Sequence, residues 1–249
     1  MVSIEQRRSL GGGLDAPDAL AAKARNENFP VASHLLPSKV RARLMAIYGF
    51  ARLADDLGDE AEGDRLALLA WLEEELDRAA VGNATHPVLQ QLSPVIRGLD
   101  LRLDPFRCLI EANRVDQQVS RYETFDDLVA YCMLSAAPVG RLVLAVFGAS
   151  TAERIALSDR VCIGLQVVEH LQDVGEDARQ GRVYLPLEDL ARFGCSEREL
   201  SGTFSGAALR GVVAMEAARA RGLLAAGMPL AASLPVRPRL AIVGFVAGG

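Results

Sequence analysis

The amino-acid sequence predicts an all-α protein that folds as a single domain. Alanine and leucine dominate its composition, only four threonines occur, and runs that alternate apolar and polar residues are hard to find. Apolar residues instead recur at helical spacing, between breaks marked by proline and glycine. The sequence shows no internal repeat and no linker rich in proline, glycine or serine, so we expect one domain.

The first four helices are expected from their starting residues. Pro37-Ser38 opens a segment with apolar residues three and four positions apart, and Asp64 begins a second such segment. His86-Pro87 starts the third, and Asp104-Pro105 is typical of an N-cap followed by proline in the first turn. These helices are predicted over about 38–60, 64–82, 87–99 and 105–120.

Similar signals define the second half of the chain. Thr124 and Thr151 are N-cap candidates, and Pro138 begins an apolar segment between them. A loop at Gly181–Pro186 separates the helix after Thr151 from a short one, and an alanine-rich helix follows. Helices are predicted over about 125–135, 138–148, 152–179, 187–193 and 205–226, with a tail helix from Pro235.

The chain ends carry their own expectations. Residues 1–16 are predicted to be a flexible lead and 17–249 the helical domain. Three glycines follow Arg7 and Arg8 at the positions where a signal peptide would have an apolar stretch. We therefore expect no signal peptide here. No apolar run reaches the roughly 18 residues of a membrane-spanning helix. The apolar segment Leu240–Gly249 is predicted to be the start of a truncated helix.

Composition excludes several classes of function. The net charge of −5 offers no basic surface for nucleic acid, and 5% aromatic residues are too few for a base-stacking surface. The four cysteines contain no CxxC pair, which argues against a zinc ribbon or a thioredoxin-type site, and free thiols are expected.

The first acidic stripe lies in the helix expected over 38–60. It consists of Tyr48, Arg52, Asp55 and Asp59, at i, i+4, i+7 and i+11, and therefore follows one helix face. The carboxylates of Asp55 and Asp59 stand one turn apart. Like charges at this spacing destabilise a helix by about 0.2–0.5 kcal/mol.

The second acidic stripe lies in the helix expected over 152–179. Its carboxylates are Glu169, Asp173 and Asp177, at i, i+4 and i+8, with Gln166 one turn before them. Both helices are otherwise apolar, so we expect the stripes to be buried or half-buried, where unpaired carboxylates are costly. Oxygen ligands without thiolates or clustered imidazoles suit Mg²⁺, which commonly shares its coordination with substrate phosphates.

A solvated helix face is the simpler explanation for a single acidic stripe. Two stripes of matching spacing on separate apolar helices are much harder to explain in that way. The pattern therefore favours two facing rows of carboxylates that bind a diphosphate through metal ions.

At these residues the sequence resembles the squalene/phytoene synthase family of head-to-head prenyl synthases. The aspartate-rich motifs of that family are similar to Asp55-Asp56-Leu57-Gly58-Asp59 and Asp173-Val174-Gly175-Glu176-Asp177. The resemblance covers roughly residues 26–249 and implies an isoprenoid-synthase-like helical bundle around a central apolar cavity. Further similar segments are Leu35-Leu36-Pro37, Ala46–Arg52, Arg121–Phe125, Tyr131-Cys132 and Gly181–Pro186.

Finer features resemble the hydroxysqualene synthase branch of the family, namely Glu27–Ser33, Tyr131–Leu144 and Glu169–Asp173. That resemblance implies that presqualene diphosphate loses diphosphate and that water captures the rearranged cation to give hydroxysqualene. Condensing members commonly carry asparagine where Glu169 stands and a basic residue where Gln172 stands. Both differences disfavour the condensation of two farnesyl diphosphates.

The resemblance also implies roles for individual residues. The expected ligands of Mg²⁺, or of Mn²⁺ in its place, are Asp55, Asp59, Glu169, Asp173 and Asp177. The expected catalytic residues are Asp55, Asp59, Asp173, Asp177 and Tyr48. The expected substrate-binding residues are Arg52, Arg182, Tyr184, Tyr131, Phe29, Gln166 and Asn28.

Purely structural roles remain open for some of these residues. Arg52 also suits an intrahelical ion pair, Arg182 a surface loop, and the aromatic residues a plain core. His170 points about 100° away from Glu169 on a helix and is expected to be structural. Asp116 is equally compatible with a functional and a solvated position.

Two other functions remain open from the sequence. One is a condensing synthase that makes presqualene or phytoene diphosphate, and the other is a non-catalytic helical assembly factor. No GxGxxG motif follows a predicted strand, so we expect no NADPH and an alcohol as the product. Expected partners are a prenyl diphosphate substrate and the enzymes that make presqualene diphosphate and reduce hydroxysqualene. The expected location is cytoplasmic, with room for peripheral contact at the inner face of the membrane, where C30 compounds reside.

Overall fold

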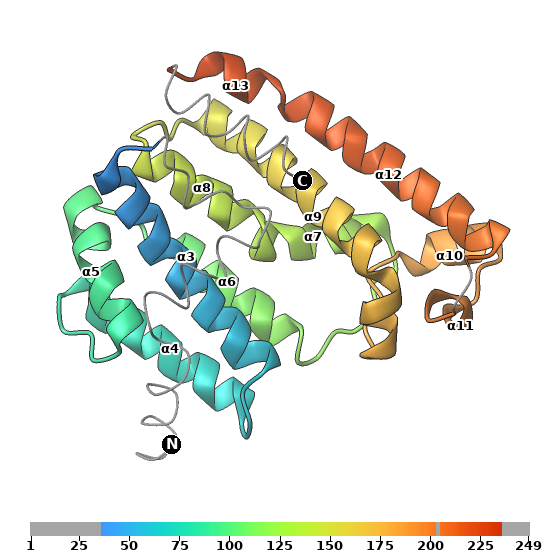
Figure 1. Cartoon of the computed structure of the whole chain (residues 1–249), viewed down its shortest axis with the longest axis horizontal. Helices are drawn as coiled ribbons and strands as arrows, with labels where there is room; N and C mark the ends of the chain where they lie inside the picture. Colours follow the sequence, from blue (N-terminus) through green and yellow to red (C-terminus); the bar gives the residue numbers. More distant parts are fainter. Residues whose placement is uncertain (1–35, 203–204, 236–249) are drawn as a thin grey trace.

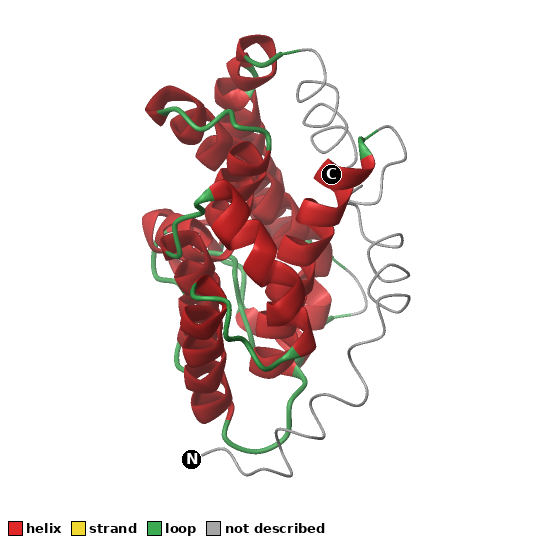
Figure 2. Ribbon diagram, turned by 90° about the vertical axis from the view of Figure 1, so that its left-hand side faces the viewer, coloured by secondary structure: helices red, strands yellow, loops and turns green. Residues whose placement is uncertain are grey.

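The computed structural model describes residues 36–202 and 205–235, and within them it contains helices and loops but no strand (Figures 1 and 2). The all-α prediction is confirmed. The helices are α3 (Ser38–Asp59), α4 (Arg65–Ala80), α5 (Pro87–Leu99), α6 (Asp104–Val115), α7 (Phe125–Ser135), α8 (Ala137–Val146), α9 (Ala152–Arg179), α10 (Leu187–Phe193), α11 (Glu197–Leu200), α12 (Ala207–Gly227) and α13 (Pro229–Ser233).

The bundle is organised around the two helices that carry the acidic stripes. Helix α3 packs against α4, α5, α6 and α8, whereas α9 packs against α7, α8 and α12 (Figure 1). Apolar residues of α3 at spacings of four and three, such as Phe50, Ala54 and Leu57, lie in the main core. Phe50 and Phe106 join α3 to α6 with ring centroids 5.1 Å apart. Each stripe is therefore fixed to a packed core on the other side of its helix.

Predicted N-caps hold where a side chain accepts a hydrogen bond from the first turn. Asp64 accepts from the backbone of Ala67 at 3.0 Å, and Thr151 accepts from Arg154 at 3.2 Å. Thr124 forms a reciprocal capping box with Asp127. The starts of α4, α7 and α9 therefore match the sequence prediction.

The prediction for α6 is wrong at both ends. Its N-cap is Leu103, because the Asp104 carboxylate pairs with Arg102 at 2.8 Å instead of capping the helix. The helix ends at Val115 and not near residue 120, because the following segment pairs with the loop after α9. There the Val183 N–H donates to the carbonyl of Ser120 at 2.9 Å.

Other differences concern short helices and the two ends of the chain. The helices α11 and α13 were not predicted, although Ser196 and Glu199 form a capping box at the start of α11. The predicted lead at 1–16, the tail helix from Pro235 and the truncated segment Leu240–Gly249 lie outside the described residues or reach beyond them.

One stretch, Phe125–Val146, has the length and mean hydropathy, 1.7, of a membrane span. It comprises α7 and α8, and 44% of its most apolar window is buried inside the fold. Core helices meet the same criteria of length and composition. The expectation that no helix spans a membrane stays a prediction.

The contact between α9 and α12 generates a testable prediction. A Cβ atom at Gly227 would lie 2.5 Å from Cγ2 of Val161 and 3.0 Å from the backbone oxygen of Leu157. We expect Gly227→Ala to lower the free energy of unfolding by about 1–3 kcal/mol, because the α9 backbone cannot yield easily. Thermal melts check this. Gly222→Ala in the same helix is the control, because nothing lies within 4 Å of its Cβ position, and it should be neutral or stabilising.

Candidate active site

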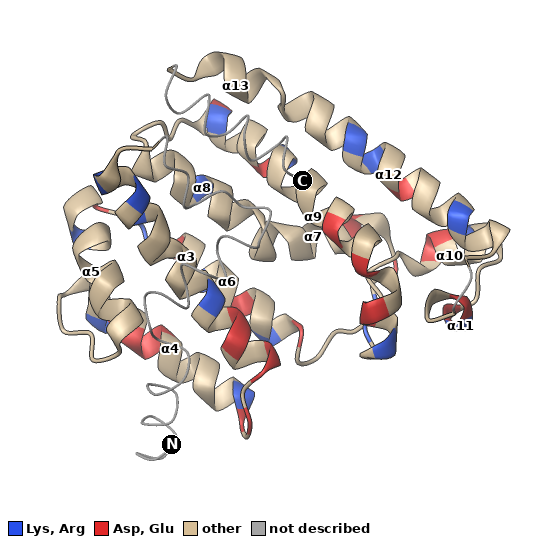
Figure 3. Cartoon of the chain, viewed as in Figure 1, with Lys and Arg blue, Asp and Glu red and all other residues tan. Residues whose placement is uncertain are grey.

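The C-terminal halves of α3 and α9 form two walls of one polar cleft with a volume of about 530 Å³. That volume is in the usual range of small-molecule sites. Acidic residues gather along the same two helix ends in Figure 3. The lining residues within the described chain are Arg52, Asp55, Asp59, Leu109, Ala112, Asn113, Asp116, Tyr131, Ser135, Gln166, Glu169, His170, Asp173, Glu176, Asp177, Gln180, Arg182 and Tyr184.

The first wall brings three members of the first stripe into the cleft. Arg52 lies there beside Asp55 and Asp59, while its guanidinium also pairs with the buried carboxylate of Asp56 at 2.7 Å. Its intrahelical ion pair and its place in the cleft are thus compatible. Asn113 on α6 donates to Oδ1 of Asp55 at 3.1 Å and fixes that carboxylate from the neighbouring helix.

The second wall carries the whole second stripe, from Gln166 to Asp177, along about the last four turns of α9. The expectation that the stripes are buried or half-buried is wrong for four of their five carboxylates. Asp55, Asp59, Glu169 and Asp173 are exposed to solvent in the cleft, and Asp177 is half-buried. The stripes lie opposite the core on their helices, so the concave surface between the walls admits water.

Arg182 connects the two walls. Its Nη2 donates to Oδ1 of Asp59 at 2.6 Å, so the loop after α9 reaches across to the end of α3. Arg121 supports that loop by donating to the carbonyl of Gly181 at 2.6 Å. The pKa of Arg182 is raised, with burial opposing its charge and the Asp59 carboxylate favouring it, so Arg182 is a cation at any ordinary pH.

An aromatic cluster borders the cleft beside α7, and all of its members except Tyr122 line the cleft. The rings of Tyr131, Tyr184 and Tyr122 lie within 5.8 Å of one another between centroids, and His170 stacks on Tyr184 at 3.8 Å. We call these four residues the aromatic wall. At its edge Tyr131 donates to Oδ2 of Asp116 at 2.7 Å, and the Tyr184 hydroxyl lies 3.4 Å from Oδ1.

The cleft shifts the protonation of several groups. Removal of water by the surrounding protein raises the pKa of Asp55 to about 7, although the side chain still reaches solvent through the opening. The same cause, followed by repulsion from Asp173, raises the pKa of Asp177 to about 6. Burial lowers the pKa of His170 to about 3, which keeps the imidazole neutral within the aromatic wall. The raised pKa values of Asp55 and Asp177 show that their negative charges are poorly compensated. A bound cation would stabilise both carboxylates.

The donor set fits a hard divalent cation. The acidic residues of the stripes offer carboxylate oxygens, no cysteine lines the cleft, and His170 is the one imidazole in the described lining. Within the described residues, no three acidic, histidine or cysteine side chains are gathered closely enough to form a protein-only metal site. This arrangement suits Mg²⁺, which keeps several waters and commonly takes one or two carboxylates together with substrate phosphates.

Three predicted site residues are not placed in the cleft. Tyr48 lies two turns before Asp55 on α3 and packs against the main core outside the cleft lining. Asn28 and Phe29 lie outside the described residues. The roles predicted for all three stay predictions.

The structure adds lining residues that the sequence analysis did not select. Asn113, Ser135, Glu176 and Gln180 line the cleft, and His170, expected to be structural, lines it as well. For Asn113 a signal existed, because it lies three residues before Asp116 on a helix that is otherwise apolar toward the core.

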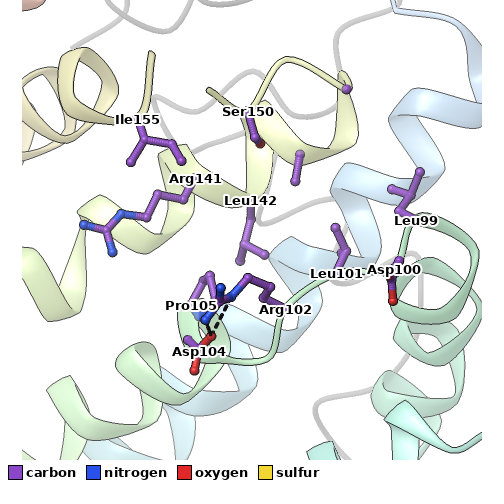
Figure 4. Close-up of a pocket in the computed structure, with 12 residues that line it drawn as sticks. Leu99, Asp100, Leu101, Arg102, Asp104, Pro105, Arg141, Leu142, Ser150 and Ile155 are labelled. Carbon is purple, nitrogen blue, oxygen red and sulfur yellow. Dashed lines mark hydrogen bonds and ion pairs between the residues drawn. The ribbon is translucent and has the colours of Figure 1, made fainter. Parts of the chain in front are cut away.

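A second cavity, of about 660 Å³, lies away from the predicted site residues (Figure 4). It borders the start of α6 and the second half of α8, and none of the stripe residues lines it. Its walls are largely apolar, with Leu99, Leu101, Leu142 and Ile155, and its polar groups include the paired Arg102 and Asp104. Among the described residues, two acidic ones, Asp100 and Asp104, line this cavity, whereas seven line the cleft between α3 and α9.

Comparison with known proteins supports the grouping that the motifs suggested. A profile of the squalene/phytoene synthase family matches residues 22–249. The chain belongs to this family. It is a prenyl-diphosphate-processing enzyme of the family, and the predicted resemblance is confirmed.

Several relatives carry the name of the predicted branch. The hydroxysqualene synthase of Zymomonas mobilis is 36% identical over 228 residues, which cover 90% of this chain and 75% of the relative. That of Rhodopseudomonas palustris is 41% identical over 219 residues, covering 84% and 72%. The crystal structure of the squalene synthase HpnC from Alicyclobacillus acidocaldarius has a TM-score of 0.84 at 39% identity, over 99% of this chain and 92% of that one.

The raised pKa of Asp55 predicts a pH-dependent effect on stability. Between its ordinary value of 3.8 and about 7, the folded state holds a proton that the unfolded chain has lost. The associated stability is complete below pH 3.8 and is lost as the pH rises through 7. In chelator, Asp55→Asn should therefore melt above the wild type at pH 8 and show a smaller difference at pH 5. Because solvent screens this exposed group, we expect about 1 kcal/mol, or about 2–4 °C.

Thermal melts of both proteins at the two pH values test this expectation. The exposed Asp126→Asn is the control, and its melting-temperature difference should be the same at pH 5 and pH 8. An equal difference for Asp55→Asn at both values would show that Asp55 titrates as an ordinary carboxylate.

Proposed function

We propose that this protein ionises presqualene diphosphate with loss of diphosphate and that water captures the rearranged cation to give hydroxysqualene. The observation that carries the proposal is the pair of carboxylate rows that face one cleft from α3 and α9, joined by Arg182. The relatives named hydroxysqualene synthase support the same reaction.

Five carboxylates would hold Mg²⁺, with Mn²⁺ as a substitute, in this proposal. Bound metal ions would supply positive charge that stabilises the diphosphate as the C–O bond breaks. The residues are Asp55 and Asp59 on α3 and Glu169, Asp173 and Asp177 on α9.

Arg182 supplies the protein's own cation for the leaving group. In the described structure it donates to Asp59, and it is 21% exposed, so its guanidinium faces the cleft. A diphosphate oxygen offers the same hydrogen-bond geometry as a carboxylate, and arginine binds both through paired N–H donors. Arg182 would thus exchange Asp59 for the diphosphate when substrate binds.

The aromatic wall supplies the other half of the chemistry. Once diphosphate leaves, a hydrocarbon cation remains, and the π faces of aromatic rings attract cations. Tyr131 and Tyr184 line the cleft and are largely buried, so they present rings from which bulk water is excluded. The cleft thus places anion-binding and cation-binding surfaces next to each other.

The charge of the second stripe favours a single diphosphate over two. Glu169 lines the cleft where condensing members commonly carry a neutral asparagine, and it adds a negative charge. One unit-charge pair at about 4 Å and an effective dielectric near 20 is worth about 4 kcal/mol before screening. Gln172 is exposed and outside the cleft lining, so this argument depends on Glu169 and not on Gln172.

The test is incubation with presqualene diphosphate and Mg²⁺, followed by chromatographic identification of products. We expect hydroxysqualene without NADPH, and no turnover in excess EDTA. Farnesyl diphosphate alone should give little or no product. Efficient conversion of farnesyl diphosphate, or squalene formation that requires NADPH, would favour the condensing alternative. Absence of turnover with every prenyl diphosphate would favour a non-catalytic assembly factor.

Substitution of a second-stripe carboxylate gives a further prediction. Asp173→Asn should lower turnover by about 10²–10³-fold, because it removes charge that stabilises the leaving group through bound metal. Helical circular dichroism should be unchanged, because the side chain is exposed in the cleft. Glu153→Gln, an exposed charge change at the start of the same helix, is the matched control and should keep wild-type turnover. Wild-type rates in Asp173→Asn would make the stripe a solvated face.

A further inference from the structure

The cleft contains one carboxylate that belongs to neither acidic stripe. Asp116 follows the last residue of α6 and lines the cleft between the stripes and the aromatic wall. Its two oxygens accept from different tyrosines, Oδ2 from Tyr131 at 2.7 Å and Oδ1 from Tyr184 at 3.4 Å. These donors hold the carboxylate in one orientation against the rings.

We propose that Asp116 is the catalytic base that takes a proton from the water that adds to the cation. This inference rests on the proposed function and names a residue for its final step. The water oxygen forms a bond to the cationic carbon, its O–H bond breaks, and the proton passes to a carboxylate oxygen of Asp116. The products are the neutral alcohol and a protonated Asp116, which returns its proton to solvent.

The hydrogen bonds leave Asp116 able to accept another proton donor. A carboxylate has about four lone-pair positions, and the two tyrosines use two of them. Both tyrosines are donors to Asp116, and burial raises their pKa values, so neither competes with it as a base. The stripe carboxylates are assigned to the diphosphate and its metal ions, and Glu176 is exposed to bulk solvent.

A second polar group that could bind the attacking water lines the same cleft. Ser135 lines the cleft one turn after Tyr131 on α7, and its Oγ is buried without a hydrogen-bond partner in the described structure. Buried hydroxyls normally have partners, and a bound water is the usual one when the site is polar. We assign the Ser135 hydroxyl to the water that attacks the cation.

The electrostatic surroundings agree with a base. Loss of solvent raises the pKa of Asp116, and the Asp59 charge raises it further, while Tyr131 and the Arg182 cation lower it. A carboxylate with a raised pKa takes a proton more readily than an ordinary one. Asp116 is therefore a better proton acceptor than an ordinary aspartate.

The test separates ionisation from water capture. Wild type, Asp116→Asn and Ser135→Ala are incubated with presqualene diphosphate and Mg²⁺, and both released diphosphate and hydroxysqualene are measured. We expect Asp116→Asn to keep releasing diphosphate while hydroxysqualene formed per diphosphate falls about tenfold or more, with other products of the cation in its place. Ser135→Ala should lower the same ratio less. A loss of structure alone would lower both quantities together and leave the ratio unchanged.

Other outcomes overturn the inference. Wild-type diphosphate release with an unchanged ratio in Asp116→Asn would show that Asp116 is not the base for the attacking water. Loss of diphosphate release with unchanged helical circular dichroism would assign Asp116 to ionisation instead. The exposed Asp126→Asn is the control and should match the wild type in both quantities. If the wild type itself releases no diphosphate, the proposed function fails, and that result is distinct from a failed role for Asp116.

Discussion

The carboxylates of α3 and α9 face one another across the cleft and repel. The surrounding structure holds the two helices in place against this repulsion. Each stripe sits on a helix whose opposite side packs into apolar core, so the walls cannot simply move apart. The Arg182–Asp59 ion pair joins the walls from a loop outside both helices. That loop is held in turn by backbone pairing of Ser120 with Val183 and by Arg121. Irregular backbone outside the two stripe helices thus determines where the cation that joins the two walls lies.

The two halves of the cleft suit the two charges that one bond cleavage produces. The stripes and Arg182 favour the anion that leaves, and the aromatic wall favours the cation that stays. Asp116 lies at the boundary, held by Tyr131 and Tyr184. A nucleophilic water would be most useful at that boundary, because it must reach the cation and still lose a proton to a base.

Helix α9 contributes both to the stability of the fold and to the candidate active site. Its C-terminal half carries the second stripe, and its N-terminal half meets α12 where Gly227 allows close approach to Val161. Small residues at such contacts let two helix backbones pack tightly, so the crossing is sensitive to a single methyl group. The N-terminal half of α9 is held rigidly by α12. This packing keeps the helix in place although the carboxylates of its C-terminal half repel one another.

The sequence by itself determined the all-α fold, most helix starts and the two stripes, because capping and i, i+4 spacing are local properties of a helix. Only tertiary structure decided what depends on contacts distant in the chain. It ended α6 at Val115, since the next residues pair with the loop after α9, and it packed Tyr48 against the core outside the cleft lining. It also made the stripes solvent-accessible and placed Asn113 against Asp55, because the facing wall of a cleft comes from another helix and is not encoded in the spacing of one.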